Sequence, residues 1–151
     1  MTEATSHLVG DELIAARSLP VHVNRVWEAF TSPEGVAAFW GGSHAAVPVE
    51  SVIIDLRVGG EFSMDTRGPN GATSRLRFTY VGVTDGSELV FDEPVTGLRT
   101  TVRMDATATG TDLTIHQRRL PPELQTDQAA RGLASILDAL AAYLSPGSFT
   151  R

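Results

Sequence analysis

The middle of the chain, residues 47–119, consists of short segments of alternating apolar and polar side chains. Turn residues separate these segments, at Gly59-Gly60, Gly68-Pro69-Asn70-Gly71, Asp85-Gly86 and Gly110. The pattern predicts strands at residues 47–58, 61–67, 75–83, 88–92, 98–106 and 112–119. Because the connections between consecutive strands are short, we expect an antiparallel meander.

Helical periodicity lies before this meander. Glu12 to Leu19 alternates weakly and predicts a first strand, and the spacing of Val23, Val26, Trp27 and Phe30 then predicts an amphipathic helix. Ser32 and Pro33 match the N-cap and first position of a second short helix, which ends at Gly41-Gly42.

A longer helix follows the meander, between Pro121-Pro122 and Pro146-Gly147. Its apolar stripe is formed by Leu133, Ile136, Leu137, Leu140 and Leu144. A single sheet has one core-facing side, and only this helix is long enough to cover it. We therefore expect an α+β fold in which a curved antiparallel sheet wraps around the C-terminal helix, with two short helices after the first strand. The space left near the short helices is the predicted pocket.

The length of 151 residues indicates one domain. We place it at residues 12–145, after a flexible N-terminus at 1–11 and before a C-terminal tail at 146–151. No apolar run reaches the roughly 20 residues of a membrane helix, and residues 1–6 lack the pattern of a signal peptide. We expect a cytoplasmic protein without membrane insertion.

The composition excludes several chemistries. The chain has no cysteine, and all 12 basic residues are arginine, so thiolate, zinc–sulfur and lysine Schiff-base sites are absent. The four histidines, His7, His22, His44 and His116, lack metal-binding spacing, and no Gly-x-Gly-x-x-Gly motif occurs. The net charge of −6 argues against nucleic-acid binding. We expect no metal and no cofactor.

Several local signatures together resemble one family. They are Arg17 to Trp27, Thr31 to Gly42, Asp55-Leu56-Arg57-Val58-Gly59-Gly60, Gly110 to Thr114 and Gly132 to Leu144. In this order and spacing the chain resembles the Activator of Hsp90 ATPase homologue 1-like (AHSA1-like) family of the START-like (SRPBCC) superfamily. The resemblance implies a helix-grip fold and often a hydrophobic ligand cavity. His22, Phe39 and Gly42 depart from the family pattern, and these departures touch the expected pocket mouth.

The cavity candidates are aromatic residues of the short helices, inward-facing residues of the strands and two leucines of the long helix. They are Trp27, Phe30, Phe39, Trp40, Phe62, Met64, Phe78, Tyr80, Phe91, Met104, Gln117, Leu133 and Leu137, with Arg57 as a further candidate at the mouth. Most of the strand positions equally suit side chains of the hydrophobic core. For Trp27 on the first short helix the core role is favoured, and for Trp40 the core and the pocket entrance are equally favoured.

Three of these candidates are polar. Tyr80 and Gln117 occupy positions whose neighbours point inward, so each needs a partner, which is a protein group, a water or a ligand. Arg57 either holds an acidic ligand group or forms a salt bridge with Asp55 that fixes the Gly59-Gly60 turn, and the salt bridge is favoured.

These features favour a binding module for a small hydrophobic or aromatic molecule. An enzyme of the cyclase, aromatase or hydratase kind is the first alternative, because such chemistry needs only positioning and one or two polar groups. A regulator of an Hsp90-type chaperone, implied by the family name alone, is the second. The outer face and the exposed edges of the sheet are surfaces through which two chains could form a homodimer.

Overall fold

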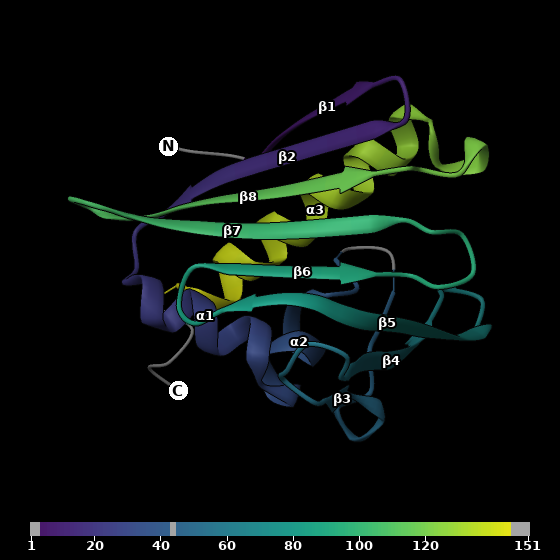
Figure 1. Cartoon of the computed structure of the whole chain (residues 1–151), viewed down its shortest axis with the longest axis horizontal. Coiled ribbons are helices and arrows are strands. Elements are labelled where there is room, and N and C mark those ends of the chain that lie inside the picture. The colour runs from purple at the N-terminus through teal and green to yellow at the C-terminus, as the bar shows by residue number, and fades with distance from the viewer. Residues whose placement is uncertain (1–3, 43–44, 146–151) are drawn as a thin grey trace.

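The computed structural model describes residues 4–42 and 45–145. Within these residues eight strands form one antiparallel sheet, in the spatial order β1-β2-β8-β7-β6-β5-β4-β3 (Figure 1). The strands are β1 (Thr5–Val9), β2 (Glu12–Leu19), β3 (Ile53–Ile54), β4 (Glu61–Arg67), β5 (Thr73–Thr84), β6 (Glu88–Asp92), β7 (Arg99–Thr107) and β8 (Gly110–Arg118). The helices are α1 (Val23–Thr31), α2 (Pro33–Phe39) and α3 (Asp127–Leu144), with short 3-10 turns η1 (Val49–Ser51) and η2 (Pro122–Leu124).

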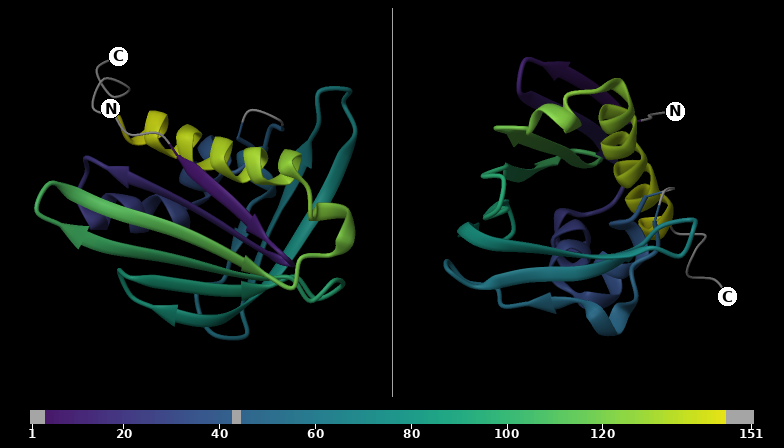
Figure 2. Two further views of the ribbon diagram at one scale, coloured as in Figure 1. Left: turned by 90° about the horizontal axis from the view of Figure 1, so that it is seen from above. Right: turned by 90° about the vertical axis from the view of Figure 1, so that its right-hand side faces the viewer.

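The sheet is curved, and all three helices lie on its concave side (Figure 2). The helix α3 turns its apolar stripe toward the sheet and buries Leu133, Leu137, Leu140 and Leu144. Thr126 caps this helix, because its side chain accepts a hydrogen bond from the backbone N–H of Ala129. The predicted α+β helix-grip fold is confirmed.

The two short helices meet at a sharp corner. The side-chain oxygen of Ser32, the predicted N-cap, accepts a hydrogen bond from the backbone N–H of Gly35 at 3.1 Å. A Cβ atom at Gly35 would clash with the carbonyl oxygen of Ala29, so only glycine permits this approach of α2 to α1. The His22 side chain caps α1 by accepting from the N–H of Asn24 at 3.1 Å. The tight corner holds Phe39 and Trp40 against the sheet.

An aromatic cluster fills the space between the short helices and the sheet. Its members are Phe30, Phe39, Trp40, Phe62, Phe78, Tyr80 and Phe91. Edge-to-face pairs hold it together, with ring centroids 4.9 Å apart for Phe30 and Phe39 and 5.3 Å apart for Trp40 and Phe62. These side chains occupy most of the space near the short helices in which the pocket was expected.

Two segments differ from the sequence prediction. No element was expected before Glu12, yet Thr5–Val9 pair with β2 through a tight turn that includes Gly10. The expected strand at 47–58 shrinks to Ile53–Ile54, because Ser51 and Val52 bond back to Pro48 and Val49 as a 3-10 turn. The predicted helix end at Pro146-Gly147, the tail 146–151, and Ser43 and His44 lie outside the described residues, and the domain boundaries remain a prediction.

An ion pair ties α3 to the sheet. Arg17 follows Leu13 and Ala15 on the inner face of β2, and its guanidinium bonds the carboxylate of Asp138 on α3. The same carboxylate accepts a hydrogen bond from the backbone N–H of Ala4 at 3.1 Å, next to β1. Since the Arg17 side chain is only 16% exposed, the ion pair with Asp138 offsets the cost of burying its charge.

We predict that Asp138→Ala lowers the free energy of unfolding by about 1–2 kcal/mol, because it leaves the Arg17 charge half-buried and unpaired. Urea unfolding measures the change. Asp105→Ala is the matched control, since Asp105 pairs with Arg103 on the exposed surface and its removal should cost less than about 0.5 kcal/mol. Equal losses in the two variants would contradict this role of Asp138.

Candidate functional site

A cavity of about 480 Å³ lies between the inner face of the sheet, the first half of α3 and the segments around residues 93–98 and 121–124. The apolar residues that line it are Trp40, Leu76, Phe78, Leu98, Ile115, Pro121, Leu124, Leu133 and Ile136. This region is called the apolar cavity below. Trp40 and Phe78 belong both to the aromatic cluster and to the cavity wall, and the Trp40 ring packs against Phe62, Phe78 and Phe91.

Two uncharged polar side chains on the sheet contribute to the wall. Thr100 on β7 and Gln117 on β8 are direct partners in the strand register. The amide nitrogen of Gln117 donates to the hydroxyl of Thr100 at 3.4 Å, which is long for a hydrogen bond. Thr100 is only 2% exposed. A loosely bonded polar pair therefore stands in an otherwise apolar stretch of the wall.

The charged groups around the cavity form hydrogen bonds or ion pairs outside it, or are exposed to solvent. Arg75 and Arg77 alternate with the inward-facing Leu76 and Phe78, so their side chains lie on the other face of β5. There the guanidinium of Arg75 bonds the Ser51 carbonyl, the Ser63 hydroxyl and Asp65. Arg77 lies 3.8 Å from Glu61.

The carboxylate of Glu93 accepts hydrogen bonds from the loop that follows it. It accepts hydrogen bonds from the backbone N–H groups of Val95 and Thr96 and from the Thr96 hydroxyl, at 2.6–2.9 Å. Partial burial alone would raise the pKa of Glu93, but these hydrogen bonds lower it below its ordinary value. Backbone bonds between Glu93 and Leu98 and between Gly97 and Glu93 further order this part of the cavity wall.

The structure brings four of the predicted cavity residues to the apolar cavity: Trp40, Phe78, Gln117 and Leu133. Eight others lie in the closed core, each at most 2% exposed: Phe30, Phe39, Phe62, Met64, Tyr80, Phe91, Met104 and Leu137. Trp27 packs half-buried against that core. None of these nine side chains lines the cavity.

Arg57 lies on the surface rather than at the cavity. Its side chain is 69% exposed, and its Nε donates to both carboxylate oxygens of Asp55 at 3.0–3.1 Å. The salt bridge stands at the Gly59-Gly60 turn, as the favoured alternative predicted. Gly59 adopts a positive φ of 88° there, which suits glycine.

The sequence interpretation missed Leu98, Thr100, Ile115 and Ile136 as cavity residues. Strand alternation from Val102 and Met104 does assign Thr100 to the inner face. Ile136 stands on the predicted apolar stripe of α3, and alternation along β8 assigns Ile115 to the same face as Gln117. Leu98 begins the strand predicted at 98–106, and the same alternation assigns it to the inner face, although in the structure it precedes β7 in a loop ordered by the Glu93 hydrogen bonds.

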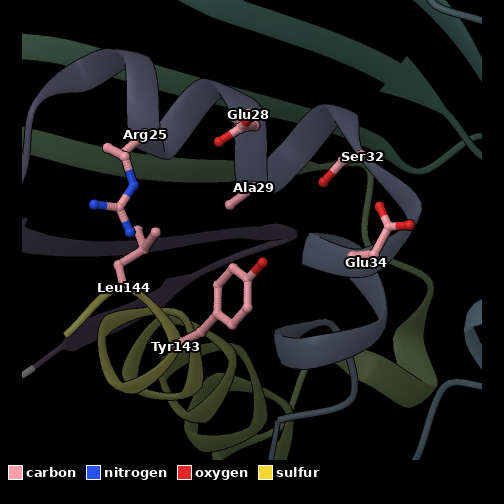
Figure 3. A pocket seen from close by; sticks show the side chains of 7 residues that line it. All are labelled: Arg25, Glu28, Ala29, Ser32, Glu34, Tyr143 and Leu144. Atoms are coloured by element: carbon pink, nitrogen blue, oxygen red, sulfur yellow. The ribbon is translucent and has the colours of Figure 1, made fainter. Parts of the chain in front are cut away.

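A second hollow of about 570 Å³, called the helical groove below, opens between α1, the start of α2 and the last turn of α3. Figure 3 shows Arg25, Glu28, Ser32 and Glu34 around it, with the ring of Tyr143 projecting from α3 into the space. Charged and polar groups dominate this groove, so it suits an apolar ligand poorly. Across residues 4–42 and 45–145, no three His, Cys, Asp or Glu side chains are grouped to hold a metal ion.

Comparison with known proteins decides the family. The family model described as Activator of Hsp90 ATPase homolog 1-like protein matches residues 20–145. The chain belongs to this family. No curated protein matches the chain. Membership suggests a ligand-binding or regulatory module without specifying a ligand.

Solved structures of several bacterial proteins share the fold. A protein of Chromobacterium violaceum is 23% identical with a TM-score of 0.82, covering 91% of this chain and 99% of that one. A Nitrosomonas europaea protein is 22% identical with a TM-score of 0.80, covering 91% and 96%. The AHSA1-like protein of Aeromonas hydrophila is 20% identical with a TM-score of 0.76, covering 91% and 94%. At these identities the similarity shows the helix-grip fold alone.

None of the helices within the described ranges is both long and apolar enough to span a membrane.

The hydroxyl of Tyr80 is buried and has no hydrogen-bond partner in the described part of the chain. Burial raises the pKa of this hydroxyl strongly, and the negative charge of Asp55 raises it further. The ring stacks on Phe62 with centroids 5.7 Å apart. Tyr80 therefore stays neutral in the folded protein at every pH at which the chain is ordinarily studied.

We predict that Tyr80→Phe raises the free energy of unfolding at pH 7 by about 1 kcal/mol, because it removes a buried hydroxyl without a partner. Urea unfolding of both proteins measures this difference. A loss of stability instead would show that the hydroxyl has a bonding partner in the folded protein.

The same variant should alter the alkaline stability profile. Tyr80 and Tyr143 are the two tyrosines, and the chain has neither lysine nor cysteine, so few other side chains titrate near pH 10. Because the pKa of Tyr80 is raised by folding, its contribution is fully present below about pH 10 and is lost as the pH rises further. The wild-type protein should therefore lose stability above pH 10 more steeply than Tyr80→Phe, which retains Tyr143. If the stability of the two proteins changed equally with pH above pH 10, the raised pKa of Tyr80 would be contradicted.

Proposed function

We propose that the protein binds a small hydrophobic or aromatic molecule in the apolar cavity. The observation that carries this proposal is the cavity itself: about 480 Å³ of space bounded mainly by Trp40, Phe78, Leu98, Leu133 and Ile136. Ligand pockets of proteins typically span about 300–1,000 Å³ and combine apolar walls with a few polar groups. An apolar ligand would remove these side chains from water, which favours binding.

The walls support a preformed site. Phe78, Ile115 and Leu133 are each at most 8% exposed and belong to strands or to α3. The loop that carries Leu98 is fixed through Glu93, and the segment after β8 is fixed by a hydrogen bond from the Gln125 side chain to the Leu120 carbonyl at 2.9 Å. A preformed cavity costs little conformational entropy when a ligand binds.

The two uncharged polar groups of the sheet wall favour binding over acid–base catalysis, and of the carboxylates that line the cavity, Glu93 is bonded within its own loop. Thr100 and Gln117 do not titrate near neutral pH. The Tyr80 hydroxyl and Arg57, which an enzyme of the cyclase or hydratase kind could use, are not among the cavity-lining groups. Chaperone regulation rests on the family name alone, and a homodimer and a cytoplasmic location remain predictions.

We predict that Ile136→Trp abolishes binding of N-phenyl-1-naphthylamine, a neutral dye that fluoresces strongly in apolar surroundings. The larger side chain at Ile136 would fill the cavity from α3, so the dissociation constant should rise at least tenfold. Fluorescence titration of the wild-type and variant proteins measures the change.

Glu28→Trp is the matched control, because it introduces the same bulk into the helical groove. This variant should bind the dye as the wild type does. Loss of dye binding in Glu28→Trp with retention in Ile136→Trp would place the ligand in the groove and overturn the proposal. Absence of dye binding by the wild-type protein would also count against it.

A further inference from the structure

We infer that the apolar cavity selects neutral ligands that carry a hydroxyl or carbonyl group, and that Thr100 and Gln117 recognise this group. The inference rests on the proposed ligand-binding function and adds the chemical class of the ligand. It predicts discrimination against purely apolar molecules and also against carboxylates of the same shape.

The polar pair interrupts an apolar row that crosses the inner face of the sheet. The row of directly paired residues runs Leu13, Gln117, Thr100, Phe91 and Tyr80, from β2 to β5. The neighbouring row is apolar throughout and runs Ala15, Ile115, Val102, Leu89 and Val83. An apolar pair at positions 100 and 117 would complete the core pattern, so packing alone does not explain these two side chains.

The pair retains unused hydrogen-bonding capacity. A glutamine side chain has two N–H donors and a carbonyl acceptor, and a threonine hydroxyl can donate as well as accept. Within the described residues, Gln117 and Thr100 share one side-chain bond of 3.4 Å, in which Gln117 donates and Thr100 accepts. The Gln117 carbonyl and the Thr100 hydroxyl proton are therefore available to a ligand. A hydroxyl can donate to the former, and a carbonyl can accept from the latter.

The surrounding charges disfavour an anionic ligand. The guanidinium groups of Arg75 and Arg77 lie on the opposite face of β5, where they meet Asp65 and Glu61. Arg75, Arg77, Glu93 and Glu123 are all among the residues that line the cavity, but the two arginines already pair with carboxylates on the outer face. A carboxylate beside Gln117 would lose its hydration without gaining a cation, which is costly.

Competition with N-phenyl-1-naphthylamine tests the inference on the intact chain. The competitors are naphthalene, 2-naphthol and 2-naphthoate at pH 7, which share one ring system and differ in their polar group. The wild-type protein should bind 2-naphthol more tightly than naphthalene and 2-naphthoate most weakly. In Gln117→Leu the preference for 2-naphthol over naphthalene should fall about tenfold, because the variant removes the acceptor. Thr100→Val should lower the same preference.

Folding is measured alongside, since a structural role would lower stability without altering the preference. Gln117→Leu should unfold at the same or a higher urea concentration than the wild type, because its amide is poorly bonded in the free protein. An unchanged preference in Gln117→Leu, or tighter binding of 2-naphthoate than of 2-naphthol, overturns the inference while dye binding still supports the proposed function. If neither the dye nor any naphthalene compound binds the wild type, both proposals fail.

Discussion

The structure depends on covering the concave side of one curved sheet. A strand that is apolar on one face must bury that face, and α3 covers the part of the concave side formed by β1 and β2. Its leucine stripe, Leu133, Leu137, Leu140 and Leu144, packs on one part of the concave side, and the ion pair between Arg17 and Asp138 ties it to β2. The remaining area must be covered by other side chains or left as a cavity.

The two short helices determine where that remaining space lies. Ser32 and Gly35 set a tight corner between α1 and α2, and the corner brings Phe39 and Trp40 against Phe62 and Phe91. These rings close one side of the concave face as dry core. The region toward the first half of α3 holds the apolar cavity. Trp40 belongs to both regions, so packing in the cluster shapes the ligand site.

The sequence predicted the fold well because the relevant signals are local. Alternation assigned Phe62, Met64 and Phe78 to the inner face, and periodicity located α3. The strand at 47–58 was overestimated, because Pro48 and Ser51 form a turn whose bonds no alternation pattern reveals. The cavity residues were predicted only in part, since the choice between core and cavity at Tyr80 or Gln117 depends on how far α3 extends across the sheet. That extent is a property of tertiary packing.

The most direct test of this account is an NMR measurement of nuclear Overhauser contacts between bound 2-naphthol and the methyl groups of the protein. The account predicts contacts to the methyl groups of Leu98, Ile115, Leu133 and Ile136, which line the apolar cavity. Contacts confined to Ala29 and Leu144, which line the helical groove, would contradict it. So would saturable binding without contacts to any of the cavity methyl groups.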